Sequence, residues 1–158
     1  MANPPTKQVL LSVTLDPATR SGAVARKALR AVLEVCPGAP TDAVLLITTE
    51  LVNNAVEHAK TPCRLDLTVE EQILTLAVTD SRPDAVPHVR TPSSGAFLKA
   101  GGRGLLLVES FTQSWGYTVD DLTKTTWARI SCNGTSDQVL SETPLRSRLV
   151  GDVDHFQA

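Results

Sequence analysis

Residues 41–59 read TDAVLLITTELVNNAVEHA, and neither proline nor glycine interrupts them. Apolar side chains recur at helical spacing through this stretch, which predicts one amphipathic helix. Thr41 is the expected N-cap, and Asp42 lies in the first turn, where the helix dipole favours a negative charge. The side chains that share the expected inward face are Ala43, Leu46, Ile47, Glu50, Leu51, Asn54, Ala55 and His58.

The second half of this face is polar, because it carries Glu50, Asn54 and His58. A buried carboxylate or amide is costly unless it has a partner, so these side chains are candidates for a binding site. The plain alternative is that the face simply reaches solvent near the end of the helix. The opposite face, with Thr49 and Asn53, is expected to be solvated, so that only Asn54 of the asparagine pair points inward.

Composition excludes several classes of function. The chain has 158 residues and a formal net charge of −2, which suits one globular domain and gives no sign of a nucleic-acid or anionic-membrane partner. No apolar run is long enough to span a bilayer, and the first residues have no signal-peptide core. Cys36, Cys63 and Cys132 lie far apart without a CxxC pair, and the histidines are equally scattered, so we expect no zinc site. These features predict reduced thiols in a cytoplasmic protein.

The remaining periodicity predicts an α/β (α+β) two-layer sandwich, a mixed but mostly antiparallel sheet of about five strands packed against three helices. The expected strands are residues 9–15, 63–69, 74–80, 115–119 and 125–132, and the other expected helices are residues 18–35 and a segment from Leu105 to Phe111. By the period of two, Asp80 shares the inward face of its strand with Leu76 and Val78, so it places a carboxylate at the edge of the core. Asp80 can equally be a turn former at a strand end.

A long segment without periodicity, residues 81–100, follows Asp80. Loops of this length in compact domains are usually functional, and we interpret this one as a lid. It leads into a glycine-rich helix start, Gly101-Gly102-Arg103-Gly104-Leu105, where exposed N–H groups and the helix dipole favour phosphate. Alone this feature is weak, because it is not a Walker loop and does not follow a strand as a dinucleotide fingerprint does.

Taken in order, ELVNNAVEH on a helix, a strand that ends in Asp80, and GGRGLLLV after a long loop resemble the GHKL ATPases, which have the Bergerat nucleotide-binding fold. The chain is most similar to the small single-domain members, the anti-sigma-factor serine kinases and their actinobacterial-type relatives. The resemblance covers roughly residues 8–132, with residues 1–7 as a flexible lead and residues 133–158 as a loose tail.

The resemblance implies a role for each matching residue, with ATP (or ADP) and Mg²⁺ as cofactors. Glu50 matches the glutamate that acts as general base on an attacking water or hydroxyl, and Asn54, one turn later, matches the asparagine that binds Mg²⁺. Asp80 matches the aspartate that accepts a hydrogen bond from the adenine amino group. The segment that wraps the phosphates is matched by Gly101, Gly102, Arg103, Gly104 and Leu105. Thr125 matches a late threonine that supports the adenine contact, although Thr126 is adjacent.

Simpler interpretations stay open for these residues. Glu50 can be a buried carboxylate paired with a basic residue, Asn54 can cap a neighbouring strand, and Arg103 can be a solvated surface charge. We favour a solvated charge for the lid residues Arg82 and Arg90.

One departure from the family pattern follows Asp80. The D-x-G-x-G box of the family reads Asp80-Ser81-Arg82-Pro83-Asp84 in this chain, so both glycines are absent and a proline fixes one φ angle. We expect the adenine contact to persist, and the approach of this backbone to ribose and phosphate to be weaker.

The resemblance implies an anti-sigma factor that phosphorylates a serine or threonine of an anti-sigma antagonist protein and binds a sigma factor in another state. Direct contact with nucleic acid or membrane is not expected, whereas formation of a homodimer is in keeping with such relatives. The altered loop favours an alternative, a non-catalytic module that uses ATP only to shape a partner surface. A detached histidine-kinase ATPase domain ranks third, because the sequence has no helix pair to carry a phosphoacceptor histidine.

Overall fold

The computed structural model describes residues 6–18, 20–34, 36–85, 108 and 111–132, and every structural statement below concerns these residues. In chain order the elements are β1 (Gln8–Leu15), α1 (Ser21–Leu33), α2 (Thr41–Ala59), β2 (Cys63–Glu70), β3 (Ile73–Asp80), β4 (Ser114–Val119) and β5 (Lys124–Ser131). α2 has the bounds that its uninterrupted pattern predicts. Of the third expected helix only Val108 and Phe111 are described, and the lid beyond Ala85 and the tail 133–158 lie outside the described residues.

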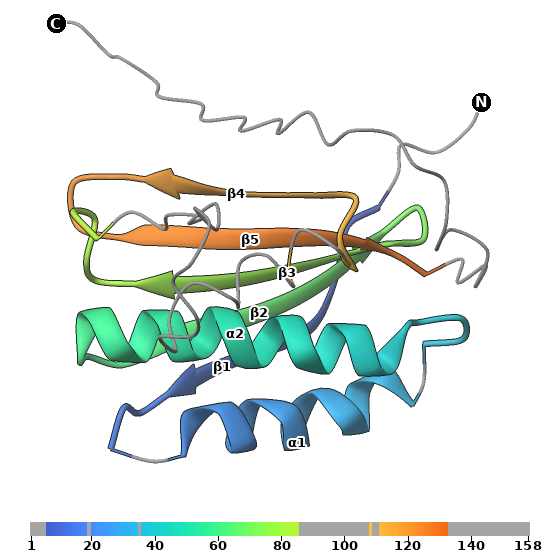
Figure 1. The fold of residues 1–158 in the computed structure, drawn as a ribbon. Coiled ribbons are helices and arrows are strands. Elements are labelled where there is room, and N and C mark those ends of the chain that lie inside the picture. Colours follow the sequence, from blue (N-terminus) through green and yellow to red (C-terminus); the bar gives the residue numbers. More distant parts are fainter. Residues whose placement is uncertain (1–5, 19, 35, 86–107, 109–110, 133–158) are drawn as a thin grey trace, which may run out of the picture.

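The strands form one sheet in the order β1-β2-β3-β5-β4, and every neighbouring pair is antiparallel. α1 and α2 lie side by side on one face of this sheet (Figure 1). α1 contacts β1 at one edge, while α2 lies over the middle strands β2 and β3 and touches β5. The predicted α+β two-layer sandwich with a five-stranded sheet is therefore confirmed, and the sheet is antiparallel throughout.

The core lies between α2 and the middle of the sheet. The strand residues that face the helices here are Leu65 and Leu67 of β2 and Leu74, Leu76 and Val78 of β3, none more than 1% exposed. The buried residues of α2 are Val44, Leu45, Ile47, Thr48, Leu51, Val52, Ala55 and Ala59. The hydroxyl of Thr48 donates to the carbonyl of Val44 at 2.7 Å, so its buried polar atom has a partner. Neither described helix has the length and apolarity that a membrane crossing requires.

The ends of α2 depend on backbone geometry. Pro40 is the N-cap and makes no side-chain capping bond, so the prediction of Thr41 as N-cap is wrong. Thr41 is the first helical residue, and its hydroxyl contacts the carbonyl of Ala39 at 3.5 Å instead of a helix N–H group. The helix ends at Lys60, which adopts the left-handed conformation with φ 53°.

The buried face of α2 is rotated relative to the predicted one. Its centre lies near Thr48, Leu51 and Ala55. Glu50 and Asn54 therefore lie on a half-buried flank instead of in the core, and His58 at the end of the predicted stripe is exposed.

The other flank of α2 lies nearest to α1. Asn53 is exposed there, as predicted, whereas Thr49 is half-buried. Arg26 of α1 donates through Nη1 to the hydroxyl of Thr49 at 3.1 Å. A Cβ atom added at Gly22 would lie 3.2 Å from Oδ1 of Asn53, so the two helices approach closely here. On this flank the two helices thus meet through Arg26 and Thr49 and through the close approach of Gly22 to Asn53. Asn54 lies on the opposite flank, away from α1.

The turn between β2 and β3 yields a first prediction. Glu71 and Gln72 both have positive φ, 46° and 63°, which is the geometry of a type I′ hairpin turn. This geometry favours Asn-Gly, so the double substitution Glu71→Asn/Gln72→Gly should raise the free energy of unfolding by about 1 kcal/mol. Urea denaturation measures the change.

The control for this prediction is Leu122→Gly in the β4–β5 loop, where the exposed residue is not among those with positive φ. Glycine there should lower stability, because it only adds freedom to the unfolded chain. A loss of stability in both variants would show that the β2–β3 turn gains nothing from glycine geometry.

Candidate functional site

Three side chains from neighbouring strands meet at one end of the helix-covered face of the sheet. Asp80, the last residue of β3, is 3% exposed and lies opposite Lys124, the first residue of β5. Nζ of Lys124 lies 3.3 Å from Oδ2 of Asp80, and both side chains are almost completely buried. Cys63 begins β2 on the other side of Asp80 and is also buried. The predicted inward position of Asp80 is what the structure shows.

Asp80 also shapes the chain that follows it. Its Oδ1 accepts a hydrogen bond from the backbone N–H of Arg82 at 2.8 Å, which is the geometry of an Asx turn. The turn-forming and core-edge interpretations of Asp80 are thus both correct, because one carboxylate oxygen holds the turn and the other faces Lys124. Lys124 in turn donates to the carbonyl of Ala85, so the ion pair and the loop 81–85 form one connected unit.

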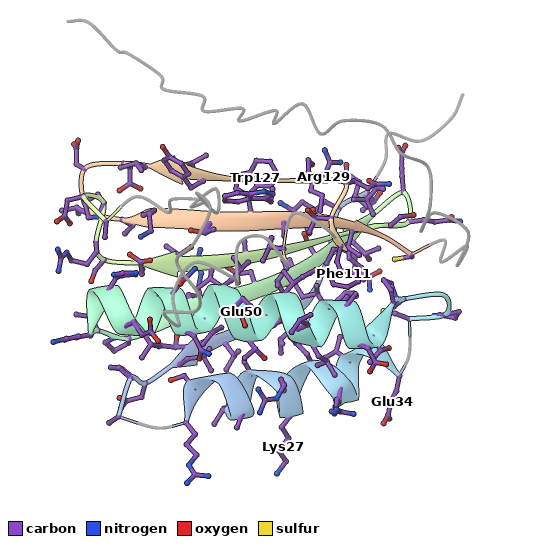
Figure 2. The ribbon with its side chains drawn as sticks, in the orientation of Figure 1. Lys27, Glu34, Glu50, Phe111, Trp127 and Arg129 are labelled. Carbon is purple, nitrogen blue, oxygen red and sulfur yellow. The ribbon has the colours of Figure 1, made fainter. Side chains whose placement is uncertain are left out.

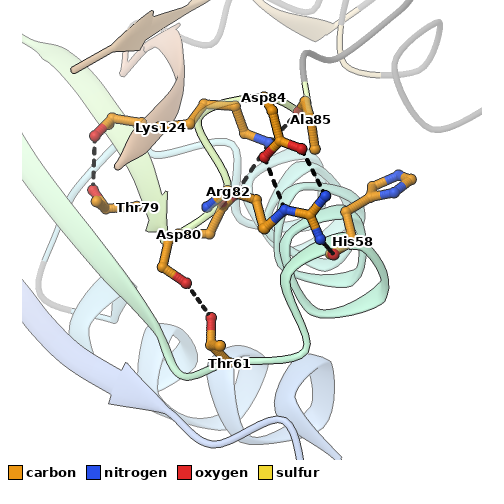
Figure 3. Close-up of polar contacts among 10 residues, drawn as sticks. His58, Thr61, Thr79, Asp80, Arg82, Asp84, Ala85 and Lys124 are labelled. Carbon is orange, nitrogen blue, oxygen red and sulfur yellow. Dashed lines mark hydrogen bonds and ion pairs between the residues drawn. The ribbon is translucent and has the colours of Figure 1, made fainter. Parts of the chain in front are cut away.

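The glycine-free loop is held by contacts of its own side chains (Figure 3). The guanidinium of Arg82 donates from Nε and Nη2 to the two carboxylate oxygens of Asp84, at 2.8 and 2.7 Å. Its Nη1 donates to the carbonyl of His58 near the C-terminus of α2 at 3.3 Å. The hydroxyls of Ser81 and Thr61 lie 2.6 Å apart. These bonds fix the loop against the end of α2. Arg82 is exposed, as we predicted for a solvated charge, and it also pairs with Asp84.

Two of these groups have shifted pKa values with clear causes. The hydrogen bonds from Arg82 lower the pKa of Asp84 to about 2. Burial, followed by the negative charge of Asp80, raises the pKa of the Cys63 thiol above its ordinary value. Cys63 therefore stays protonated at neutral pH and acts as a small apolar neighbour of Asp80.

Glu50 and Asn54 lie one helical turn apart on the flank of α2 that faces away from α1, and Figure 2 shows Glu50 about halfway along the helix. Because α1 occupies the β1 side, this flank looks toward the β5 side of the sheet. Within the described ranges, neither side chain has a hydrogen bond or ion pair, so the pairing and strand-capping interpretations receive no support there. Both side chains can bind a ligand without losing an existing partner.

Thr125 is not brought together with Asp80. Alternation along β5 turns Thr125 to the uncovered face of the sheet, where its hydroxyl lies 2.9 Å from that of Thr79. There it lines a depression of about 290 Å³. Its neighbour Thr126 is buried on the face that carries Asp80. The assignment of Thr125 to the adenine side is therefore corrected, because the predicted position was one residue out of phase.

Lys124 and Cys63 are the site residues that the sequence interpretation missed. A signal for Lys124 exists: in steps of two it shares the face of Thr126, Ala128 and Ile130, which are buried. The predicted strand begins one residue later, at Thr125, and therefore does not include Lys124. The predicted phosphate segment, Gly101, Gly102, Arg103, Gly104 and Leu105, lies outside the described residues.

The donor set fits a nucleotide with a magnesium ion. A buried carboxylate is a suitable acceptor for the amino group of a base, and the low dielectric strengthens such a bond. No cluster of three metal-binding side chains occurs in the described part of the chain. A single amide oxygen, that of Asn54, suits Mg²⁺ that is held mainly by phosphate and water. Glu50, one turn away, can take a proton from a group that attacks the phosphate.

The comparisons with known proteins point in the same direction. The family model described as a histidine kinase-like ATPase domain matches residues 14–130, from the end of β1 to the end of β5. No curated protein matches the chain significantly.

The ion pair yields a second prediction. Asp80→Asn leaves the buried ammonium of Lys124 without a counter-charge and should lower the free energy of unfolding by about 3 kcal/mol. Lys124→Met should cost a comparable amount, and the double variant should lose at least about 1 kcal/mol less than the sum. Denaturant titrations of the four proteins give the coupling energy.

The exposed pair Arg64–Asp66, 2.8 Å apart, is the matched control. Its coupling should stay below about 0.5 kcal/mol, because solvent screens it. Strict additivity at Asp80 and Lys124 would mean that the two charges do not stabilise one another.

The loop yields a third prediction. An NMR titration of the Asp84 carboxyl should give a pKa of about 2, below the ordinary 3.8. Since the folded value is the lower one, the contribution of this carboxylate to stability is present above about pH 4 and is lost as the pH falls toward 2. Arg82→Gln should return the pKa of Asp84 toward its ordinary value, whereas Arg64→Gln should leave it unchanged. An unchanged pKa in Arg82→Gln would disprove the role of the guanidinium.

Proposed function

This chain belongs to the histidine kinase-like ATPase domain family, and from that premise we propose that it is an anti-sigma factor that binds ATP with Mg²⁺ and phosphorylates a serine or threonine of an anti-sigma antagonist. The observation that carries the proposal is the buried carboxylate of Asp80, which faces the helix layer at the C-terminal end of α2. It supplies a fixed acceptor for the adenine amino group, and guanine presents a carbonyl there instead.

Each remaining role follows from position along α2. We assign Asn54 to Mg²⁺. It lies on the flank toward β5, one turn before His58. The carbonyl of His58 accepts from Arg82, so this end of α2 is the one near Asp80. Glu50 lies one turn further from that end. A nucleotide whose base contacts Asp80 would therefore extend its phosphates along this flank, with the metal near Asn54 and the reacting phosphate near Glu50.

Glu50 is the proposed general base. It would accept the proton of the antagonist hydroxyl while that oxygen forms a bond to the γ-phosphorus and the bond to the β–γ bridging oxygen breaks, which releases ADP. Asn54 would hold the metal, which would supply positive charge to the phosphates. The predicted phosphate segment, Gly101 to Leu105, would complete the phosphate contacts.

The antagonist and a sigma factor are the proposed partners, bound in different nucleotide states, and a homodimer is the proposed assembly. These proposals rest on the resemblance of residues 8–132 to anti-sigma-factor kinases in motif order. The net charge supports protein partners over DNA. A chain with a formal charge of −2 has no excess of basic residues for DNA, so control of transcription would act through protein partners.

A non-catalytic ATP-binding module is the second candidate function, and one observation favours it. The loop 81–85 closes on itself through Arg82 and Asp84 and on α2 through the His58 carbonyl. A loop held in this way has fewer free backbone groups for ribose and phosphate than a loop with two glycines. Such a site could bind ATP weakly and use it only to change the surface that a partner contacts.

The proposal yields a fourth prediction, which separates binding from transfer. Calorimetry should detect ATP binding that is stronger with Mg²⁺ than without it. Glu50→Ala should keep this binding and lower phosphate transfer by at least about a hundredfold, because general bases contribute that much. Transfer is measured as acid-stable label from γ-labelled ATP in proteins of a lysate of the source cells.

The control is Glu57→Ala, which removes an exposed carboxylate from the last turns of the same helix and should change neither quantity. ATP binding without any Glu50-dependent label would favour the non-catalytic module. Acid-labile label would point to histidine, and no binding at millimolar ATP would overturn the nucleotide proposal itself.

A further inference from the structure

The proposed function gives no role to Lys124. It is the first residue of β5, lies opposite Asp80 in the sheet register, and its side chain is 4% exposed. Burying an ammonium group and a carboxylate is costly, and apolar side chains in place of both Lys124 and Asp80 would fill the same space with less desolvation. Stability alone is therefore a poor reason for a charged pair at this position.

The hydrogen bonds of the pair leave capacity on both partners. An ammonium group has three N–H donors. Among the described residues, Lys124 uses one for the carboxylate of Asp80 and one for the carbonyl of Ala85, which leaves one donor. A carboxylate has about four acceptor positions, of which the N–H of Arg82 and the ammonium of Lys124 use two. The pair thus offers a donor directly beside an acceptor.

A donor beside an acceptor is complementary to one edge of adenine. On that edge the exocyclic amino group is a donor and the adjacent ring nitrogen N1 is an acceptor. Asp80 has lone pairs that neither Lys124 nor the N–H of Arg82 occupies, and a base whose amino group donates to one of them can place N1 beside the ammonium. The two groups lie 3.3 Å apart, close enough for neighbouring atoms of a single base to contact both of them.

We propose that Lys124 is a second base-recognition residue, which donates a hydrogen bond to N1 of adenine while Asp80 accepts from the amino group. This inference rests on the proposed function, because it assumes that the base binds at Asp80. Both groups are held in place, Asp80 by the N–H of Arg82 and Lys124 by the carbonyl of Ala85. The order of donor and acceptor is thereby fixed, and a 6-oxopurine, which presents the reverse order at these two atoms, is rejected.

A purely structural tether is the competing explanation. In that case Lys124 serves only to hold Ala85 and the loop near the sheet, and it never touches the base. Its removal would then weaken every purine nucleotide by the same factor. Recognition of N1 instead makes the effect depend on whether the nucleotide has that nitrogen, and nucleotide analogues can separate the two explanations.

The experiment compares three nucleotides on the unaltered protein by calorimetry with Mg²⁺ present. ATP is the reference, 1-deaza-ATP lacks only the N1 acceptor, and 7-deaza-ATP is a matched control that lacks a nitrogen on the other ring. A lost hydrogen bond to a charged donor should weaken 1-deaza-ATP by about ten- to a hundredfold relative to ATP. 7-deaza-ATP should bind like ATP.

Lys124→Met then tests whether the lysine is the donor. In this variant ATP and 1-deaza-ATP should bind with equal affinity, whereas Lys124→Arg should restore part of the difference. If Lys124→Met does not fold, equal binding of ATP and 1-deaza-ATP by the unaltered protein still overturns the inference.

Two outcomes would overturn the inference in different ways. Equal binding of ATP and 1-deaza-ATP by the unaltered protein would remove Lys124 from base recognition and leave the proposed ATP function intact. Tighter binding of GTP than of ATP would show that the pair recognises a 6-oxopurine and would contradict both the fixed order and the adenine assignment. If ATP does not bind at all, the proposed function and this inference fail together.

Discussion

The ion pair between Asp80 and Lys124 is the interaction on which the site end of the sheet depends. It joins β3 to β5 at the point where their pairing begins, and through the carbonyl of Ala85 it also fixes the chain that leaves β3. Two charges almost without solvent contact carry a desolvation penalty that only close pairing and further hydrogen bonds offset. The N–H of Arg82 and the carbonyl of Ala85 supply those bonds. The result is a charged group that is buried and yet held in a single orientation, as recognition of a polar ligand requires.

The position of α2 beside α1 on one face of the sheet is the second constraint, because it assigns a different task to each side of one helix. One flank packs against α1 through Arg26 and Thr49, and the face centred on Leu51 packs against β2 and β3. Among the described residues, the flank with Glu50 and Asn54 has a hydrogen bond or ion pair with neither α1 nor a partner side chain. The apolar core therefore positions these two side chains without containing them, and they are half-buried.

The sequence predicted the elements well and their rotation less well, and the difference has physical causes. The bounds of α2 were predictable because proline and glycine occur only outside it, and Asp80 was predictable because strict alternation leaves a single choice of face. The inward face of α2 was misjudged because contacts with both α1 and the sheet make its apolar arc wide. A wide arc has no sharp centre, so Glu50 and Asn54 were placed too deep and Thr49 too far out.

β5 shows how small an error can exchange the members of a site. With a period of two, a shift of one residue exchanges the buried and exposed faces of a strand. The predicted strand starts at Thr125, whereas β5 starts at Lys124, so the prediction omits the lysine at the first position. Choosing Thr125 over Thr126 selected a hydroxyl on the wrong side of the sheet, and two adjacent threonines gave no local signal to correct the choice. A charged residue at a strand end resembles a solvated terminus in sequence, and only its partner across the sheet reveals that it is buried.

The loop after Asp80 shows how a site can persist when the residues of a motif change. Glycine permits many backbone conformations, so a glycine-rich loop loses more conformational freedom when it becomes ordered. Here the alternation of Asp80, Arg82 and Asp84 gives the loop a shape of its own: the first residue turns inward to Lys124, and the other two pair with each other in solvent. Arg82 adds a bond to the last turn of α2. The loop has therefore already lost its conformational entropy before any ligand arrives, which lowers the cost of binding at Asp80 and limits how far the backbone can follow the phosphates. In the proposed site, the residues that restrict this backbone near the phosphates would also fix the position of Asp80, and the balance of the two effects would decide whether the domain uses ATP for transfer or only for recognition.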